Sequence, residues 1–376
     1  MTKIFMFVNV DWFFLSHRLP IAKVAADKEV DMTVFTDFTR AHKKECYTGF
    51  SLLQSPIRRT YSGFYSSCME FFKLFVLIRR ERPAIIHAVT VKPIIFLGIV
   101  CFVLRIPFIA SISGLGPAFL PTSYWGKARL LIIKSLYRLI FSSEKTRVIC
   151  QNANDASVLI DQSLVMREKI AMAEGSGIDL QKYQPKKNAE SDLITILMAS
   201  RMLGSKGVRE FCAAAGVIQT KYDFHVNFSL AGPVDFDSPD FLDEDEIVEM
   251  CESNKVQFLG SRSDLKDLLA KTDIFVLPSY YAEGIPKVLL EAAACGCAVI
   301  TTDHPGCRDA IVSGETGMLV PPKDSTALEN TLSYLLSDRG LIKSMGKSGR
   351  QLAVQKFCIT KVIDIHYSLY QAFVKR

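Results

Sequence analysis

Residues 273–301 read DIFVLPSYYAEGIPKVLLEAAACGCAVIT, and this stretch decides the fold. An apolar run at 273–277 leads into a short polar turn, then a helical stretch at 285–295 and a second apolar run at 297–301. Apolar runs of this length that alternate with helices are typical of parallel strands buried on both faces. The stretch therefore predicts one strand–helix–strand unit of a parallel α/β sheet.

The same alternation extends in both directions and occurs twice along the chain. Further strands are expected at 3–8, 31–36, 84–88, 107–112, 147–150, 193–199, 224–231, 255–259 and 317–320. Further helices are expected at 17–27, 65–82, 93–105, 126–142, 153–161, 206–220, 264–270, 325–337, 339–356 and 359–374. Between the two series, the polar stretch 183–192 (YQPKKNAESD) is typical of a linker. The sequence predicts two Rossmann-like, doubly wound α/β domains, 1–182 and 190–358, that face each other across a cleft. The last helix, within 359–376, could pack on either domain, and packing back on the first is one of the two possibilities.

Composition narrows the class of protein. Of the 376 residues 49% are apolar and 22% charged, which is ordinary for a globular protein and argues against disorder. The net charge of +6 is unevenly spread: residues 1–180 hold 23 Lys and Arg against 14 Asp and Glu, and the rest hold 22 against 25. The amino-terminal half is therefore expected to meet an anionic partner, which could be a nucleic acid, a membrane surface or a phosphorylated ligand.

The chain start, the longest apolar run and the cysteines bear on the compartment. Residues 1–8 lack the long apolar run and cleavage site of a signal peptide. The longest apolar run, 94–104, is about half the length that a bilayer span needs. The ten cysteines show neither a metal-binding nor a disulfide pattern. We expect a cytoplasmic protein without a transmembrane helix.

A candidate anion site follows the first strand of the second half. Residues 198–207 read MASRMLGSKG, so that Arg201 and Lys206 lie between a strand end and a helix start. A helix start favours anions, and Arg supplies a forked donor set that suits phosphate. The alternative is a solvated loop with two surface cations.

Two glutamates lie eight residues apart in the opening stretch. Glu283 is expected in the turn and Glu291 in the helix, with the backbone N–H groups of Gly284 and Ile285 near the helix start. Carboxylates accept hydrogen bonds from sugar hydroxyls, and cations bind phosphates. Together with Arg201 and Lys206, the set suits a nucleotide sugar. Two exposed glutamates at a helix start are the ordinary alternative.

The ordered motifs resemble a known family. The second half carries, in order, Arg201-x4-Lys206-Gly207, Ala231-Gly232-Pro233, Glu283-Gly284-Ile285-Pro286 with Glu291, Gly296, Thr301-Thr302-Asp303, Pro305-Gly306, Asp309, Gly314-Glu315-Thr316-Gly317 and Val320-Pro321-Pro322. In this set the chain resembles family 4 glycosyltransferases with the GT-B fold. The variant EGIPKVLLEAAACG at 283–296, with Phe14-Leu15-Ser16-His17-Arg18-Leu19-Pro20 near the start, is similar to bacterial O-antigen and capsule transferases.

The resemblance implies an enzyme, a role for each residue, and partners. Arg201 and Lys206 would hold the donor diphosphate, Glu283 would contact the transferred sugar, Glu291 would bind the ribose, and the Gly284 and Ile285 amides would position the sugar or phosphate. The family retains anomeric configuration. The expected reaction moves a sugar, such as the N-acetylhexosamine GalNAc, from a UDP-sugar to a polyprenyl-diphosphate-linked glycan in O-antigen or surface polysaccharide synthesis.

The first half departs from the family pattern. Residues 1–48 contain no glycine, although many members have a glycine-rich loop after the first strand. The candidate acceptor or cleft residues are His17, His87, Ser113 and Gly114, the last two from the turn Ser113–Gly116. For both histidines, capping or core packing is the alternative.

Asp235-Phe236-Asp237 forms a D-x-D, which chelates metal in another glycosyltransferase fold. Here it lies in an acidic loop that runs to Glu246, and we interpret it as solvated surface. We expect no metal requirement and no cofactor.

Three segments of the first half, 69–82, 92–105 and 127–141, are basic and apolar together. A helix of this composition can lie in the headgroup plane of an anionic membrane, and a core helix with a basic solvent face is the alternative. Peripheral attachment to the inner face of the cytoplasmic membrane is the expectation.

Other functions are weighed against this one. They are a transferase with a soluble acceptor, an epimerase on the same fold, a non-catalytic GT-B binding or scaffold protein, and a nicotinamide dehydrogenase, which lacks a G-x-G-x-x-G. Nucleic acid is the least favoured partner.

Overall fold

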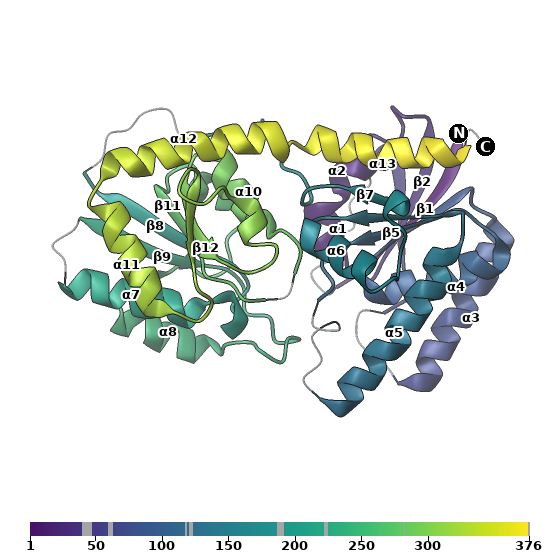
Figure 1. Cartoon of the computed structure of the whole chain (residues 1–376), viewed down its shortest axis with the longest axis horizontal. Coiled ribbons are helices and arrows are strands. Elements are labelled where there is room, and N and C mark those ends of the chain that lie inside the picture. The colour runs from purple at the N-terminus through teal and green to yellow at the C-terminus, as the bar shows by residue number, and fades with distance from the viewer. Residues whose placement is uncertain are drawn as a thin grey trace. The chain divides into compact units, whose positions relative to one another are not determined.

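The computed structural model describes residues 1–39, 47–58, 63–116, 119, 123–185, 192–221, 225–281 and 283–374. The chain forms two compact units, Met1–Ser176 together with Ile359–Arg376, and Gly177–Cys358 (Figure 1). The boundary falls earlier than the 182/190 of the sequence-based division because Ile178 and Tyr183 pack into the core of the second unit. Most of the predicted linker, residues 186–191, lies outside the described residues.

Unit 1 is a parallel sheet of seven strands in the order β3-β2-β1-β4-β5-β6-β7. Its strands are β1 Thr2–Val8, β2 Val30–Thr36, β3 Phe50–Gln54, β4 Ile85–Val89, β5 Phe108–Ile112, β6 Thr146–Cys150 and β7 Ile170–Met172. Its helices are α1 Asp11–His17, α2 Leu19–Lys23, α3 Phe64–Glu81, α4 Val91–Leu104, α5 Tyr124–Ser142, α6 Ala153–Asp161 and α13 Ile359–Val374, with a 3-10 turn at Arg167–Lys169.

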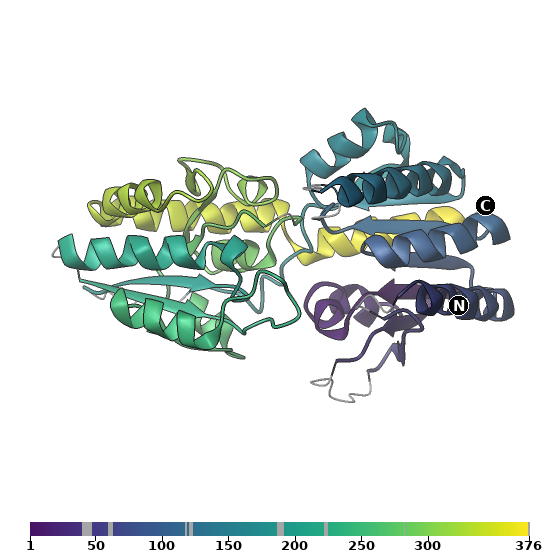
Figure 2. The ribbon, with the colours of Figure 1, turned by 90° about the horizontal axis from the view of Figure 1, so that it is seen from below.

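Strand β1 shows why both faces of this sheet are covered. Successive side chains point to opposite faces, and here both sets are apolar. Phe5 and Phe7 join the core under α3, α4 and α5, whereas Ile4 and Met6 join the core under α1, α2 and α13. Figures 1 and 2 show helices on both faces of the sheet. The carboxyl-terminal helix α13 therefore completes unit 1, as the sequence allowed.

Unit 2 is a parallel sheet of six strands in the order β10-β9-β8-β11-β12-β13. Its strands are β8 Ile194–Ala199, β9 Val226–Ala231, β10 Gln257–Phe258, β11 Ile274–Leu277, β12 Ala298–Thr302 and β13 Gly317–Val320. Its helices are α7 Val208–Lys221, α8 Glu244–Ser253, α9 Leu265–Leu269, α10 Lys287–Ala294, α11 Ser325–Leu336 and α12 Arg339–Lys356, with 3-10 turns at Gly204–Lys206 and Arg308–Ala310. The stretch 273–301 forms β11, α10 and β12, with β11 and β12 paired in parallel.

Three local predictions need correction. The predicted helix 17–27 corresponds only to the short α2, Leu19–Lys23, which has Pro20 in its first turn, and the preceding helix α1, Asp11–His17, was not predicted. The edge strands β3 and β7 were not predicted. The predicted acidic loop ends sooner, because α8 begins at Glu244: the Asp243 side chain accepts a hydrogen bond from the Asp245 N–H, and the acidic first turn is favoured by the helix dipole.

No helix in the described ranges is both long and apolar enough to cross a bilayer.

Candidate functional site

The site is built from two loops that leave neighbouring strands of unit 2. The first follows β8 and carries Arg201 and Lys206; the second follows β11 and carries Glu283. The Tyr280 N–H donates to the Ser205 carbonyl at 2.9 Å and joins the loops. Gly207 has a φ of +82°, and a Cβ there would collide with the Pro278 carbonyl. Glycine is therefore required where the first loop turns into α7 against the second.

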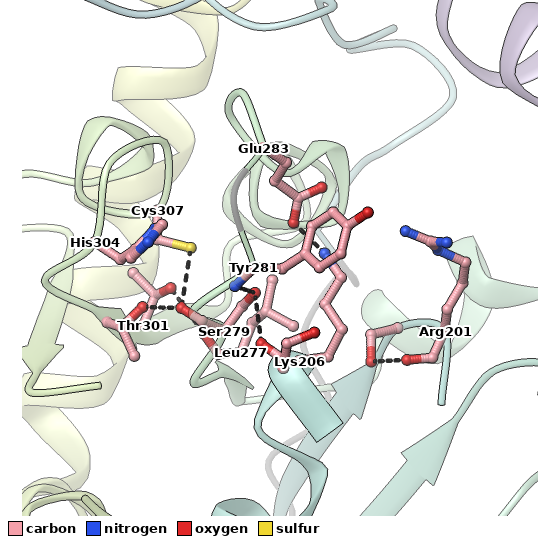
Figure 3. A network of polar contacts seen from close by, with 12 residues as sticks. Arg201, Lys206, Leu277, Ser279, Tyr281, Glu283, Thr301, His304 and Cys307 are labelled. Carbon is pink, nitrogen blue, oxygen red and sulfur yellow. Dashed lines mark hydrogen bonds and ion pairs between the residues drawn. The ribbon is translucent and has the colours of Figure 1, made fainter. Parts of the chain in front are cut away.

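Tyr281 lies between the two cations. Its ring centroid is 5.0 Å from Lys206 Nζ and 5.5 Å from Arg201 Cζ, which is cation–π range for both (Figure 3). The predicted pair is therefore not a pair of solvated surface cations, because both side chains converge on one aromatic ring. Sequence reasoning missed Tyr281, although it stands two residues before Glu283 in the stretch quoted first.

Lys206 is mostly buried, with 7% of its side chain exposed, and its Nζ contacts Glu283 Oε1 (Figure 3). Gly306 lies against the backbone of the Glu283 loop. Its φ is +86°, and a Cβ there would collide with the Gly284 carbonyl. The structure thus brings two of the predicted site residues, Lys206 and Glu283, into direct contact.

The surroundings of Asp235 correct the interpretation of the D-x-D as solvated surface. Its Oδ2 accepts a hydrogen bond from Arg201 Nη1 at 2.6 Å, and only 13% of its side chain is exposed, so it is not solvated surface. Burial alone would lower the pKa of Arg201, but the hydrogen bond to Asp235 and the contact with Tyr281 raise it above its ordinary value. Arg201 is therefore held as a cation in a fixed direction.

Glu291 lies in the second turn of α10 and is buried. Its Oε1 accepts a hydrogen bond from Tyr183 Oη at 2.8 Å and lies 3.8 Å from Lys287 Nζ. Burial raises the pKa of Glu291, and Lys287 and Tyr183 oppose the rise. Gly284 and Ile285 are buried just before α10, which starts without a side-chain cap.

Glu291→Gln is expected to stabilise the protein near pH 7, by about 1 kcal/mol, because it removes a buried charge and keeps an acceptor for Tyr183. Since the folded pKa lies above the unfolded value, the wild-type free energy of unfolding falls as pH rises from about 4.5 through the folded pKa. The variant should lose that fall. Urea unfolding at several pH values measures it, and parallel pH profiles for the two proteins would contradict the expectation.

The candidates of unit 1 have different surroundings. His87 is fully buried, with Nδ1 2.7 Å from Tyr370 Oη and Nε2 2.7 Å from Ser111 Oγ. Burial lowers its pKa well below the ordinary value, with His366 and Arg18 adding to the effect. This is a packed core position, and it does not support His87 as an acceptor-binding residue.

The other three candidates lie toward the ends of α1 and β5. His17 is the last residue of α1 and stacks on Phe13, with ring centroids 4.2 Å apart. Ser113, half-buried in the turn after β5, accepts a hydrogen bond from the buried Arg18 at 3.0 Å, and Gly114 follows with a φ of +118°. Arg18 belongs to the quoted motif but was not singled out.

Within the described residues, no group of three or more His, Cys, Asp or Glu side chains is arranged to hold a metal ion. Asp235, the first residue of the D-x-D, is engaged with Arg201 instead.

Comparison with known proteins agrees with this geometry. The family described as glycosyl transferases group 1 matches residues 179–352, and the family described as glycosyl transferase 4-like matches residues 3–152. One relative is the N,N'-diacetylbacillosaminyl-diphospho-undecaprenol alpha-1,3-N-acetylgalactosaminyltransferase of Campylobacter jejuni, 29% identical over 91% of this chain and 93% of its own length.

A second relative is the UDP-Gal:alpha-D-GlcNAc-diphosphoundecaprenol alpha-1,3-galactosyltransferase of Escherichia coli, 27% identical over 79% of this chain and 77% of its own length. Among solved structures, sucrose-phosphate synthase from Thermosynechococcus elongatus superposes with a TM-score of 0.80 at 20% identity, over the full length of both chains. Because the two family matches together span most of the 376 residues and the fold agrees, the chain belongs to the group 1 glycosyltransferases, with a 4-like amino-terminal domain, and has the GT-B fold.

Proposed function

We propose that this glycosyltransferase moves a sugar from a UDP-sugar to a polyprenyl-diphosphate-linked glycan in O-antigen or surface polysaccharide synthesis, with an N-acetylhexosamine such as GalNAc as the sugar. The names of both relatives support the acceptor class, the name of the Escherichia coli relative supports a UDP-sugar donor, and the name of the Campylobacter jejuni relative supports the sugar. The observation that carries the proposal is the convergence of Arg201 and Lys206 on Tyr281, opposite the carboxylate of Glu283.

Each part of the site then has a task. Arg201 and Lys206 bind the diphosphate, and Glu283 accepts hydrogen bonds from the transferred sugar. Since both protein contacts of Glu291 are made by Oε1, Oε2 is the atom that accepts from the ribose hydroxyls. The Gly284 and Ile285 amides, just before α10, help to place the sugar or a phosphate oxygen.

The proposed reaction retains configuration at the anomeric carbon. The bond from that carbon to the diphosphate oxygen breaks, the acceptor oxygen attacks the same face, and the acceptor proton passes to the leaving phosphate. The protein positions both substrates and stabilises the negative charge that grows on the leaving group. Two fixed cations supply that stabilisation, so we propose that no metal and no cofactor is needed.

The test is a screen of UDP- and GDP-sugars against a synthetic lipid-diphosphate-linked glycan, with and without EDTA. A new α-linked lipid product from one UDP-sugar, unchanged by EDTA, is the expected result. Transfer to soluble sugars only would favour the soluble-acceptor alternative, and no turnover with any donor would favour a scaffold.

We also propose that the protein attaches peripherally to the inner face of the cytoplasmic membrane, and exposed side chains of unit 1 support this proposal. Helix α4 packs between α3 and α5, and the first turns of α3 and α5 lie toward the lower edge of this unit in Figure 1. Those turns carry Phe64, Tyr65, Tyr124 and Trp125, each about four-fifths exposed. Exposed aromatic side chains are favoured at the boundary between headgroups and acyl chains.

The charge of α5 fits the same partner. Lys127 and Arg129 are exposed near its start, and Leu131 and Ile132 beside them are more than three-fifths exposed. Arg138 instead donates to the carbonyls of Gln162 and Ser163 at 3.3 Å. Basic and apolar groups on one exposed helix suit an anionic bilayer.

Trp125→Ser together with Tyr124→Ser should lower binding to vesicles that contain anionic phospholipid by about tenfold, because both exposed rings are lost. Vesicle co-sedimentation at physiological salt measures it, and the matched control is Tyr334→Ser, an exposed tyrosine of α11. Wild-type protein that ignores such vesicles would contradict membrane attachment.

A further inference from the structure

The segment after β9 is tied to the loop that carries the two cations. The Met202 N–H donates to the Pro233 carbonyl at 2.9 Å, and the Leu242 N–H donates back to the Met202 carbonyl at 3.0 Å. Asp240 adds two bonds, from the Gly204 N–H to its carbonyl at 3.0 Å and from the Ser205 N–H to its Oδ2 at 2.7 Å. The acidic segment 233–242 is thus held against this loop by hydrogen bonds, and these bonds fix the position of Asp235 relative to the loop.

Asp235 and Tyr281 constrain Arg201 from two directions. Asp235 takes the Nη1 end of the guanidinium at 2.6 Å, and the Tyr281 ring lies 5.5 Å from its central carbon. A guanidinium has five N–H donors in a planar fork, so one carboxylate bond directs the group without exhausting its capacity to bind phosphate. An arginine on a loop otherwise loses side-chain entropy when it binds a ligand.

We propose that Asp235 is a positioning residue for donor binding: it aims the guanidinium of Arg201 at the diphosphate. The inference rests on the proposed function and goes beyond it, because it gives a task to a residue of the D-x-D that needs no metal. Asp235 differs in this from Glu283, which contacts its cation, Lys206, and is itself assigned to the sugar.

The proposal makes a specific prediction about which part of the donor is sensed. Arg201 meets only the phosphates, so loss of Asp235 should weaken binding of UDP and leave binding of uridine unchanged. Asp235→Asn is expected to raise the UDP dissociation constant about fivefold to tenfold, because a charge-assisted hydrogen bond becomes a neutral one. Asp235→Glu keeps the carboxylate and should recover part of the affinity.

A double-mutant cycle separates positioning from a general effect on the loop. In protein that already carries Arg201→Ala, Asp235→Asn should change UDP affinity by less than about twofold, because there is no guanidinium left to aim. The matched control is Asp245→Asn, which makes the same charge change on the exposed first turn of α8. Calorimetric titration with UDP and uridine gives the affinities, and thermal melting shows that each variant is folded.

Three outcomes overturn the inference and leave the proposed donor standing. The first is that Asp235→Asn binds UDP as tightly as wild type while Arg201→Ala binds it more weakly. The second is that Asp235→Asn binds UDP more tightly than wild type, which would make Asp235 a competitor of the diphosphate. The third is that Asp235→Asn weakens UDP binding as much in protein that carries Arg201→Ala as in protein that keeps Arg201. Wild-type protein that binds no UDP would overturn the proposed donor, and the inference with it.

Discussion

A Glu283→Ala variant is expected to lose release of UDP from its correct UDP-sugar, with turnover at least about 10³-fold below wild type. The carboxylate lies on a loop whose backbone packs closely against Gly306, and it contacts Lys206. In the transition state the sugar ring gains positive charge while the diphosphate leaves, and a fixed carboxylate stabilises that charge. A coupled assay for free UDP measures the loss.

Binding of UDP itself separates catalysis from affinity in this variant. UDP has no transferred sugar, and removal of Glu283 leaves Lys206 without the carboxylate that it contacts. We therefore expect UDP to bind Glu283→Ala at least as tightly as wild type. Glu283→Gln should keep the shape but not the charge, and Glu315→Ala, on an exposed turn, is the matched control. Turnover that survives in Glu283→Ala would remove this residue from the site.

The strand ends and the cation loop could be predicted from sequence because they follow from short-range patterns. The apolar runs around 273–301 have a length typical of buried strands, and strand ends in a parallel sheet lie on one edge. Arg201, Lys206 and Glu283 each stand just past such an end. Their common neighbourhood therefore follows from topology alone.

Asp235 and Tyr281 could not be predicted because their partners are remote in sequence. Asp235 is 34 residues from Arg201, and the acidic run around it has the composition of a solvated surface. Its burial comes from backbone bonds between 233–242 and the cation loop, which leave no mark on side-chain periodicity. The same acidic composition concealed α8, whose first turn is stabilised by its acidic residues.

His87 shows the opposite difficulty. A histidine near the end of an apolar strand fits a pocket and a core equally well, and the deciding partners come from elsewhere. Tyr370, the residue that places it in the core, lies 283 positions away on α13. Since the sequence left the docking of that helix open, it could not decide the role of His87 either.

Lys206→Met is expected to weaken UDP binding by about tenfold or more and to lower turnover by about 10²–10³-fold. Methionine fills much of the space of the lysine stem beside Tyr281, so packing is largely kept while the charge is lost. The loss falls on the leaving diphosphate, whose negative charge is largest in the transition state. Steady-state transfer and UDP titration measure the two effects, and Lys266→Met, on the exposed side of α9, is the matched control.

Because Lys206 contacts Glu283, the effect of Lys206→Met on UDP binding should depend on whether Glu283 is present. In Lys206→Met the Glu283 carboxylate keeps its charge beside the incoming diphosphate, and like charges repel. Adding Glu283→Gln removes that repulsion, so the double variant should bind UDP more tightly than Lys206→Met alone, although it turns over no faster. The effects of the two substitutions on UDP affinity would then be non-additive, while turnover would not recover. This result is expected if Lys206 binds the phosphates and Glu283 binds the sugar. If Lys206→Met instead bound UDP as wild type does, Lys206 would be only the partner of Glu283, and Arg201 alone would hold the diphosphate.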